Sequence, residues 1–469
     1  MTQSKSLPDE SFRDSIATIR KDGKRKWIYA KKPSGRLYNY RKWLSYLLFL
    51  LFFVGPFIKP NGQPLLLLNF FEREFIIFGL YLWPQDTYIL FLMMITLIIF
   101  IILFTVVYGR IWCGWVCPQT IFLEMLFRRV EYWIEGDYRQ QIKLQQQNWN
   151  GEKIFKKGTK NLIYIALSVL IISTLASYVV GFDKMKEIYV QGPAQYPKAF
   201  LAIAVFSFLF FIVFSWFREQ VCLIVCPYGR LQGVLLDAKS IVVSYDYKRG
   251  EPRGAFRQGE IRPFAGKGDC INCLNCVHVC PTGIDIRNGT QLECVNCTAC
   301  IDACEDVMKR VKLPTALIRL ASQENIEKGT KTGFTWRTIA YSAVLLALVS
   351  ALFVIILSRK PLETTIIRTP GLLYQTQEDG SISNLYNVKF INKTREDLPV
   401  EIRVLSHKGT IEMRSGNMII KKQGSGQSVF FLKLNPSDLE GTITKVQFGV
   451  FAGDRRIDKI RLTFVGPIK

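Results

Sequence analysis

Histidine is almost absent from this chain of 469 residues, which contains only His278 and His407. Neither lies in a long apolar run, and no Cys-x2-Cys-His occurs, so neither bis-histidine haem in the membrane nor covalent c-type haem is expected. No Gly-x-Gly-x-x-Gly follows a predicted strand and no P-loop pattern occurs, which leaves a bound nucleotide without support. The first forty residues also lack the apolar core of a signal peptide. The chain is therefore not expected to hold haem or a nucleotide.

Cysteine is present in a strict pattern, because all twelve cysteines fall into four short motifs. They form two pairs and two quartets: Cys113/Cys117, Cys222/Cys226, Cys270/Cys273/Cys276/Cys280 and Cys294/Cys297/Cys300/Cys304. Each quartet reads C-x2-C-x2-C-x3-C, the spacing that wraps a [4Fe–4S] cluster, and Pro281 follows the first quartet as in bacterial ferredoxins. The second quartet has Glu305 at that position. The pattern predicts an iron–sulfur protein that transfers electrons.

The two quartets also predict how the ligands are shared. In two-cluster ferredoxins the fourth cysteine of each run ligates the other cluster. One cluster is thus expected on Cys270, Cys273, Cys276 and Cys304, and the second on Cys280, Cys294, Cys297 and Cys300. A pair of four-cysteine zinc sites fits less well, because structural zinc uses C-x2-C knuckles separated by a longer insert. His278 is expected to shape hydrogen bonding to the sulfurs, not to coordinate iron.

Five apolar runs are long enough to cross a membrane, at residues 43–58, 88–108, 161–180, 199–216 and 339–357. A sixth run, 65–83, carries Glu72, Arg73 and Glu74 at its middle, and charges facing lipid are costly, so an interfacial or re-entrant segment on the outer side is expected. Lys and Arg are dense in 1–42, 110–160 and 217–336 and sparse in 59–86 and 181–198. The positive-inside rule then predicts a multi-pass protein of the bacterial inner membrane, with the quartets in the cytoplasm and the C-terminal region in the periplasm. The net charge of +23 is attributed to these loops and to membrane lipid, and nucleic acid is not an expected partner.

The predicted fold class is a polytopic α-helical membrane protein with an inserted α+β dicluster ferredoxin domain and a C-terminal all-β immunoglobulin-like sandwich. Residues 362–469 support the sandwich, because short alternating runs are separated there by turn signals. That domain is expected to dock a partner, and His407 is expected at its surface. The chain is predicted to begin with a basic cytoplasmic tail at 1–42, followed by four transmembrane helices within 43–216 that include a C-x3-C-P motif at 113–118. A cytoplasmic region at 217–336 follows, with a second such motif at 222–227 and the ferredoxin domain at about 260–312. The last transmembrane helix is predicted at 337–358 and the periplasmic sandwich at 359–469.

The two C-x3-C-P motifs close the second and fourth predicted spans, so both are expected at the cytoplasmic face. On a helix, residues i and i+4 share one face, and each pair could present two sulfurs to one metal ion. The following proline disfavours helix at the second cysteine, so each motif is expected where a helix ends. A disulfide is a poor alternative in a reducing cytoplasm, and inert buried cysteines are the plainer one.

Four thiolates at one membrane face would favour Cu(I) over Cu(II), with the clusters supplying the electron. Arg110, Arg218 and Arg230 are expected to help keep the thiols ionised. The same pairs could instead relay electrons to a quinone or to a partner protein.

The chain resembles the FixG or CcoG family of cytochrome oxidase accessory proteins in the order of its parts. These parts are the basic tail, W-C-G-W-V-C-P-Q-T, V-C-L-I-V-C-P-Y-G-R-L-Q, the tandem quartets, the last span and the β-domain. The resemblance covers nearly the whole chain. It implies reduction of Cu(II) to Cu(I) during assembly of a cbb3-type oxidase, with Cys113, Cys117, Cys222 and Cys226 handling copper and the other eight cysteines binding two [4Fe–4S] clusters. The implied partners are a cytoplasmic electron donor, copper-handling proteins and oxidase subunits, and a homodimer stays open. The alternatives are a ferredoxin-type electron-transfer subunit of a quinol-linked respiratory complex and a non-enzymatic assembly scaffold.

Overall fold

The computed structural model describes residues 18–467 except 20–21, 23, 61–63, 73, 78–79, 84–85, 330–335, 359, 372, 395, 414–417 and 423. Most of the first half of the predicted basic tail, and Arg73 of the predicted interfacial segment, therefore lie outside the described residues. The chain divides into two compact units, Met1–Ser350 and Ala351–Lys469, which are described separately.

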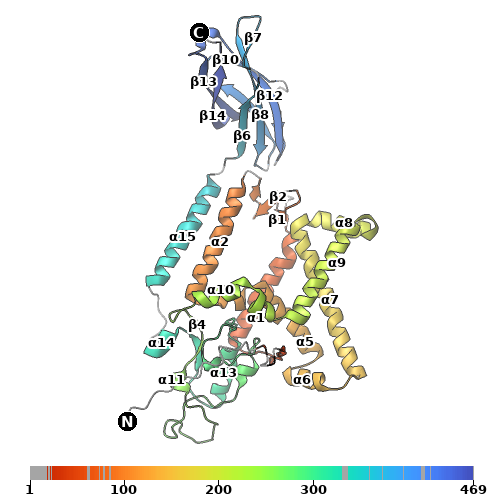
Figure 1. Cartoon of the computed structure of the whole chain (residues 1–469), viewed down its shortest axis with the longest axis vertical. Helices are drawn as coiled ribbons and strands as arrows, with labels where there is room; N and C mark the ends of the chain where they lie inside the picture. Colours follow the sequence, from red (N-terminus) through yellow and green to blue (C-terminus); the bar gives the residue numbers. More distant parts are fainter. Residues whose placement is uncertain are drawn as a thin grey trace. The chain divides into compact units, whose positions relative to one another are not determined.

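Four of the described helices are long and apolar enough to cross a membrane. They are α2 (Thr87–Tyr108), α7 (Gly151–Val180), α9 (Pro197–Ile212) with its π-helical continuation η6 (Val213–Phe217), and α15 (Trp336–Leu357) (Figure 1). At 1.5 Å per residue, the 22 residues of α2 span about 33 Å, enough for a hydrocarbon core. No more than 22% of the apolar window of any of these helices is buried within the protein, so most of their side chains face outward and require lipid around them. The chain is a multi-pass membrane protein.

The first predicted span is helical, but its helix begins at Arg36, ahead of the predicted apolar run. Helix α1 covers Arg36–Val54 and continues into a 3₁₀ turn, η2 (Gly55–Phe57). Three basic residues lie in its first two turns, so its uncharged part is shorter than the roughly 20 residues that a span needs. The count of long apolar helices among the described residues is thus four, where the sequence predicted five spans. The Tyr178 hydroxyl donates to the carbonyl oxygens of Leu51 and Phe52, which places the end of α1 beside the end of α7.

The sixth apolar run forms a small antiparallel sheet in the order β1-β2-β3 (Leu66–Asn69, Glu74–Ile77, Leu80–Leu82). Glu72 lies in the turn between the first two strands, where its carboxylate accepts from the Asn69 amide. Glu74 accepts from the Tyr81 hydroxyl of the neighbouring strand. The two described charges that interrupt the apolar run, Glu72 and Glu74, therefore belong to a hairpin turn and the start of its second strand.

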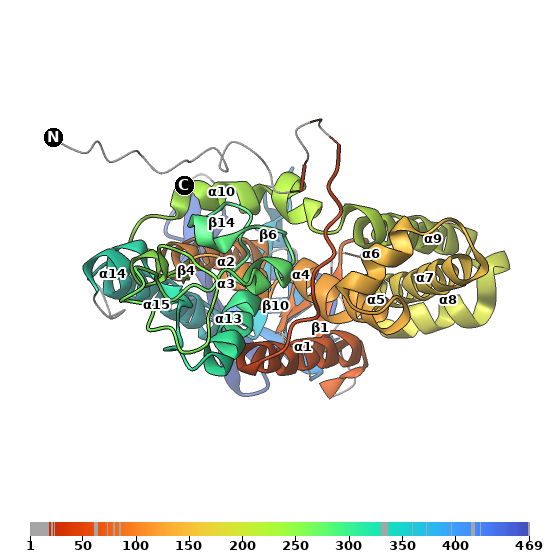
Figure 2. The ribbon, with the colours of Figure 1, turned by 90° about the horizontal axis from the view of Figure 1, so that it is seen from below.

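Short helices connect the long ones within the first unit. They are α3 (Ile111–Trp115), α4 (Pro118–Phe122), the π-helix η5 (Leu123–Phe127), α5 (Arg128–Ile134), α6 (Tyr138–Gln146), α8 (Phe182–Gln195, bent at Gly192), the π-helix η7 (Val221–Val225) and α10 (Pro227–Leu235). Helix α7 packs against α5, α8 and α9, and Figure 2 shows these helices side by side. Phe127, Tyr164 and Phe214 are buried between them, with ring centroids 4.7 Å apart for both Phe127 contacts.

The cysteine quartets lie in a region built on one two-stranded antiparallel sheet. Its elements are β4 (Val242–Tyr245), α11 (Tyr247–Gly250), α12 (Asn275–His278), the 3₁₀ turn η8 (Ile286–Asn288), α13 (Ala299–Arg310), β5 (Ile318–Ala321) and α14 (Gln323–Lys328). Strands β4 and β5 pair with each other, and their apolar side chains pack with the cysteines in one core. The carboxylate of Asp302 in α13 accepts from the backbone N–H groups of Leu37 and Tyr38, which fixes the start of α1 to this region.

The second unit is a sandwich of two antiparallel sheets. One sheet has the order β10-β12-β8-β6, with β7 also paired to β8, and the other has the order β11-β9-β13-β14. The strands are β6 (Leu362–Arg368), β7 (Gln375–Thr376), β8 (Ile382–Asn392), β9 (Leu398–Val404), β10 (Gly409–Met413), β11 (Met418–Ile420), β12 (Ser425–Leu434), β13 (Ile443–Ala452) and β14 (Arg455–Val465), and a 3₁₀ turn, η9 (Pro436–Asp438), precedes β13. Three fully buried rings, Tyr386, Phe430 and Phe448, meet between the sheets. The predicted all-β immunoglobulin-like sandwich is confirmed.

Candidate redox centre

The eight quartet cysteines line two separate cavities, and each cavity draws on both quartets. Cys270, Cys273, Cys276 and Cys304 line the first cavity. Cys280, Cys294, Cys297 and Cys300 line the second, where Cys276 also reaches the wall. Apolar side chains such as Ile284, Ile286 and Leu317 complete the two walls. The structure thus brings together the two sets of four thiols that the spacing predicts, with the fourth cysteine of each quartet on the opposite cavity.

The backbone of each quartet turns through the left-handed region at two equivalent positions. Asn272 and Leu274 have φ of 56° and 58°, and Asn296 and Thr298 have φ of 53° and 64°. Non-glycine residues adopt this conformation at a cost, and successive turns of this type direct N–H groups into a concavity that suits anions, including iron–sulfur clusters. Four thiols and such a concavity in each quartet fit a [4Fe–4S] cluster.

The two cavities differ in exposure to solvent. At the first, Cys273 is exposed, while Cys270 and Cys276 are buried. At the second, Cys297 is buried, and the Arg128 guanidinium from α5 donates to the carbonyl oxygen of Pro281 at 3.0 Å, directly after Cys280. His278 is exposed and stacks on Tyr138, with ring centroids 5.6 Å apart.

Each C-x3-C pair places its first cysteine in a helical turn and its second outside it. Cys113 lies in α3, and Cys222 lies in the π-helix η7. Cys117 and Cys226 are extended, with ψ of 124° and 114°, because the next residue is proline. The predicted interruption of the helix is confirmed. Proline then begins a new helix in both motifs, so the two cysteines of a pair do not share one helical face as the i, i+4 spacing suggested.

The four thiols of the two pairs gather in one region. The thiols of Cys117 and Cys226 are close enough to Cys113 to help raise its pKa. The thiols of the other three paired cysteines have the same effect on the pKa of Cys222. Burial is the largest cause of both shifts, which bring the pKa of Cys113 to about 11 and that of Cys222 to about 12. Both thiols are therefore protonated at neutral pH when no metal is bound. Within the described part of the chain, no three His, Cys, Asp or Glu side chains converge closely enough to hold a single metal ion.

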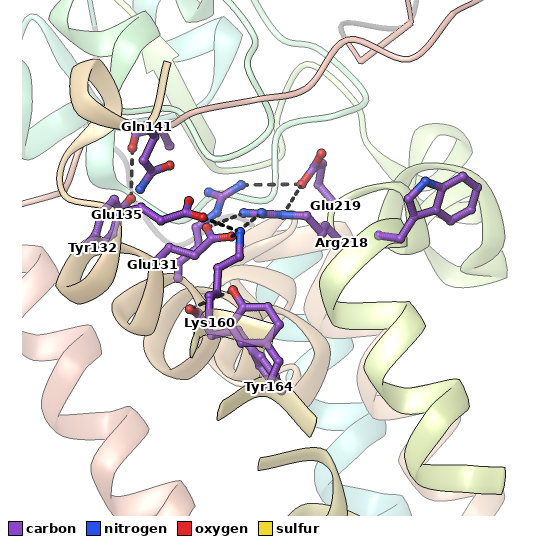
Figure 3. A network of polar contacts seen from close by, with 12 residues as sticks. Glu131, Tyr132, Glu135, Gln141, Lys160, Tyr164, Arg218 and Glu219 are labelled. Atoms are coloured by element: carbon purple, nitrogen blue, oxygen red, sulfur yellow. Dashed lines mark hydrogen bonds and ion pairs between the residues drawn. The ribbon is translucent and has the colours of Figure 1, made fainter. Parts of the chain in front are cut away.

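The expected electrostatic help from arginine is weaker than burial at these two thiols. Arg110 lowers the pKa of Cys113, but less than burial raises it. The Arg218 guanidinium is joined to the carboxylate of Glu131 by two hydrogen bonds of 2.7 and 2.9 Å (Figure 3). The side chain of Arg230 lies outside the described part. Arg110 therefore acts on Cys113 in the predicted direction, but burial outweighs it, so Arg110 alone does not keep this thiol ionised.

The first pair is packed directly on the second cavity. A Cβ added to Gly114 would lie 2.5 Å from the carbonyl oxygen of Val295 and 2.9 Å from the backbone nitrogen of Cys297, so only glycine allows this approach. Cys113 packs against the small apolar cluster that contains Cys297, with Cys300 beside it. The backbone between Cys113 and Cys117 is thus in contact with the backbone of a quartet.

Buried polar groups hold this junction together. Arg110 donates to the side chain of Gln232 in α10 and to the carbonyl oxygens of Gly229 and Leu292, which joins both motifs to the quartet region. The Gln232 amide in turn donates to Cys113 Sγ at 3.3 Å. The Arg41 guanidinium donates to the carbonyl oxygen of Gly114 at 2.6 Å. The sequence singled out neither Gly114, Gln232 nor Arg41, because nothing in their local spacing marks them.

Comparison with known families agrees with this arrangement. A 4Fe–4S dicluster domain matches residues 217–323, a second 4Fe–4S binding domain matches residues 90–138, and the Ig-like fold at the C-terminus of FixG matches residues 352–467. The second of these models covers the first C-x3-C pair but no quartet.

Curated relatives match most of the chain. Protein RdxB of Cereibacter sphaeroides is 34% identical over 82% of this chain and 83% of its own length. Protein RdxA of the same organism is 35% identical over 79% of this chain and 80% of its own length. The nitrogen fixation protein FixG of Rhizobium meliloti is 30% identical over 81% of this chain and 79% of its own length. The chain therefore belongs to the FixG family and is a membrane iron–sulfur electron-transfer protein.

Proposed function

We propose that this protein reduces Cu(II) to Cu(I) at the thiols of its two C-x3-C pairs, with electrons that pass through the quartet region. The observation that carries this proposal is the contact of Gly114 with the backbone of Val295 and Cys297. It places the paired thiols beside the second cavity, so an electron held there has a short covalent and packed route to Cys113.

In this proposal two [4Fe–4S] clusters occupy the two cavities, one on Cys270, Cys273, Cys276 and Cys304 and the other on Cys280, Cys294, Cys297 and Cys300. When bound, such clusters supply single electrons. Each electron given up converts one Cu(II) to Cu(I), so no hydride or proton need move with it. Exposure at Cys273 makes the first cavity the entry for electrons from a soluble donor, and the second cavity, none of whose four cysteines is exposed, delivers them.

The paired cysteines act as soft ligands that favour the reduced ion. Thiolate sulfur selects Cu(I), so transfer of copper to these side chains draws the metal toward its reduced state. Because Cys113 and Cys222 are protonated beforehand, binding must release protons from them. After the Cys113 thiol has lost its proton, the Gln232 side-chain amide remains as a hydrogen-bond donor to the Cys113 sulfur. Copper is the substrate here, and it leaves with one electron more than it brought.

The family resemblance gives the proposed setting. The basic tail and the basic loops around the quartets favour a cytoplasmic position for the redox centre and a periplasmic position for the sandwich, in the inner membrane of a bacterium. The product Cu(I) would serve assembly of a cbb3-type cytochrome oxidase, with the sandwich as the part that meets oxidase subunits or copper-handling proteins.

The test uses the full-length protein with reconstituted clusters, reduced under anaerobic conditions and mixed with Cu(II). Cu(I) is measured with a chelator that is specific for it, and loss of the reduced-cluster paramagnetic resonance signal is followed in parallel. Replacing all four paired cysteines by serine should leave iron and sulfide contents unchanged and abolish the copper-dependent loss of signal. Cu(I) formation at the original rate in this variant would show that the pairs are not the copper site. Protein with oxidised clusters serves as the control for reduction by thiols alone.

A further inference from the structure

A cavity of about 480 Å³ lies apart from the cysteines, between the N-terminal segment and the ends of α7 and α9. Four basic side chains and two carboxylates line it: Arg25, Lys26, Lys157, Lys160, Glu131 and Glu135. The cavity is too polar for an apolar ligand, and it has more cations than anions.

The carboxylates of this cavity already have cationic partners. Arg218 holds Glu131 with two hydrogen bonds, and Lys160 lies 2.8 Å from Glu135, as the converging side chains in Figure 3 show. Arg25 is itself paired with Glu219 at 3.1 Å. Within this network each carboxylate is matched by a cation, so none of these groups needs a further ligand.

Lys26 and Lys157 are the two cationic side chains of the cavity lining that have no carboxylate partner in this network. Neither forms an ion pair with a carboxylate in the part of the chain that the structure describes, and the Lys157 ammonium has the neutral Gln145 side chain as its acceptor, at 3.0 Å. The lining as a whole carries four cationic side chains against two carboxylates, and an anion would offset this excess of positive charge. The cavity is thus built for a ligand with negative charge.

The position of the cavity along the helices indicates where that ligand comes from. On α7 the cavity is lined by residues from Lys157 to Tyr164, where the polar first turns of the helix give way to its apolar part. On α9 and η6 it is lined by Ser215, close to the end of the apolar run. Trp27 and Tyr29 also line it, and such rings favour the membrane interface. The cavity therefore lies at the level of lipid headgroups.

We infer that this cavity binds the headgroup of an anionic phospholipid, with the phosphate between Lys26 and Lys157. Basic pockets beside transmembrane helices on one membrane face bind lipid headgroups in this way. Burial raises the pKa of Tyr29 to about 12, so its hydroxyl is available as a donor to a phosphate oxygen. The polar network continues from Glu131 through Arg218, Glu219 and Arg128 to the Pro281 carbonyl oxygen, so the lipid would be held at one end of a chain of contacts that reaches the second cavity.

The experiment compares lipid binding by the full-length protein and two double variants. Lys26→Ala/Lys157→Ala removes the two unmatched cations. Lys24→Ala/Lys156→Ala is the matched control, because it removes the same charge from neighbouring positions that do not line the cavity. Each protein is exchanged into nanodiscs that contain either phosphatidylglycerol or phosphatidylcholine, and retained lipid is counted by native mass spectrometry after gentle release.

Wild type and control should retain phosphatidylglycerol in preference to phosphatidylcholine. Lys26→Ala/Lys157→Ala should bind phosphatidylglycerol roughly 30-fold more weakly, since a lysine near an anionic membrane surface contributes about a factor of five. Equal retention by both double variants would overturn the proposal. Occupation of the cavity by inorganic phosphate in detergent, with no preference between the two lipids in nanodiscs, would show that the source is free phosphate and would also overturn it.

Discussion

Replacement of Gly114 by alanine should separate the proposed copper site at the C-x3-C pairs from its electron supply. The new Cβ would lie 2.5 Å from the Val295 carbonyl oxygen, whereas ordinary contact begins at 3.4 Å, so the backbone must move by about 0.9 Å. The three atoms nearest to the new methyl group are all backbone atoms, which cannot turn aside as a side chain can. Overpacking of this kind costs about 1–3 kcal/mol. The first C-x3-C pair should therefore shift away from the second cavity.

The assay is single-turnover oxidation of chemically reduced protein by Cu(II), followed by paramagnetic resonance of the reduced clusters. Gly114→Ala should slow this step several-fold, because the electron must then cross a wider gap between the second cavity and Cys113. Reduction of the clusters by a soluble donor should keep its original rate, because the first cavity is not touched. Gly158→Ala is the matched control, since a Cβ at Gly158 in α7 meets nothing within 4 Å.

A wild-type rate of copper-dependent oxidation in both Gly114→Ala and the larger Gly114→Val would refute the route through this contact. Equal slowing of cluster reduction and copper reduction would refute it as well, because it would show general damage to the quartet region. Iron and sulfide contents equal to those of the Gly158→Ala control are required for either conclusion.

Three further outcomes follow from the described contacts. Glu131→Gln should lower stability by about 3 kcal/mol, because it leaves the buried Arg218 with only the more distant carboxylate of Glu219, at 3.7 Å, and thermal unfolding followed by tryptophan fluorescence measures the loss. The pKa of Glu131 falls from 4.5 to about 2, because the nearby cations Arg218 and Lys160 outweigh the opposing effect of burial. The ionised Glu131 thereby contributes about 3 kcal/mol to stability, which is fully present above pH 4.5 and is lost as the pH drops from 4.5 to 2. The melting temperatures of wild type and Glu131→Gln should therefore converge over this pH range. Cys270→Ser/Cys304→Ser should perturb the paramagnetic resonance signal of one cluster only, because both cysteines line the first cavity. Cys270→Ser/Cys280→Ser should perturb the signals of both clusters, because these two cysteines line different cavities. The reverse pattern would contradict the exchange of fourth ligands between the quartets.

The sequence predicted the quartet region well because its determinants are local. Four thiols within eleven residues need a fixed series of tight turns, and the spacing of Cys270 to Cys280 already contains that requirement. The exchange of Cys280 and Cys304 between cavities follows from the tandem arrangement. The apolar lengths of α2, α7, α9 and α15 were likewise readable, because the bilayer imposes its thickness on the chain.

The sequence predicted the C-x3-C pairs less well, because their surroundings come from distant segments. Pro118 and Pro227 correctly indicated that the helix is interrupted, but not that a new helix begins at the same residue. The close approach of Gly114 to Cys297 joins positions 183 residues apart, and one glycine among the 33 in the chain carries no local mark of it. The pKa values of Cys113 and Cys222 depend on burial, which nearby arginines in the sequence could not reveal.

The unequal exposure of the two cavities gives the electron path a direction. A soluble donor can approach the first cavity at Cys273, whereas Cys297 of the second is buried and touches the segment of Gly114. If copper instead took electrons at the exposed cavity, the Gly114 contact would have no part in the reaction, and the paired cysteines could be replaced without loss. Under the proposed copper reduction, the opposite order brings the electron to the thiols of the C-x3-C pairs, which are soft ligands that favour the reduced ion. Entry at the cavity of the exposed Cys273 and delivery at the cavity beside Gly114 is therefore the order that the arrangement of all twelve cysteines favours.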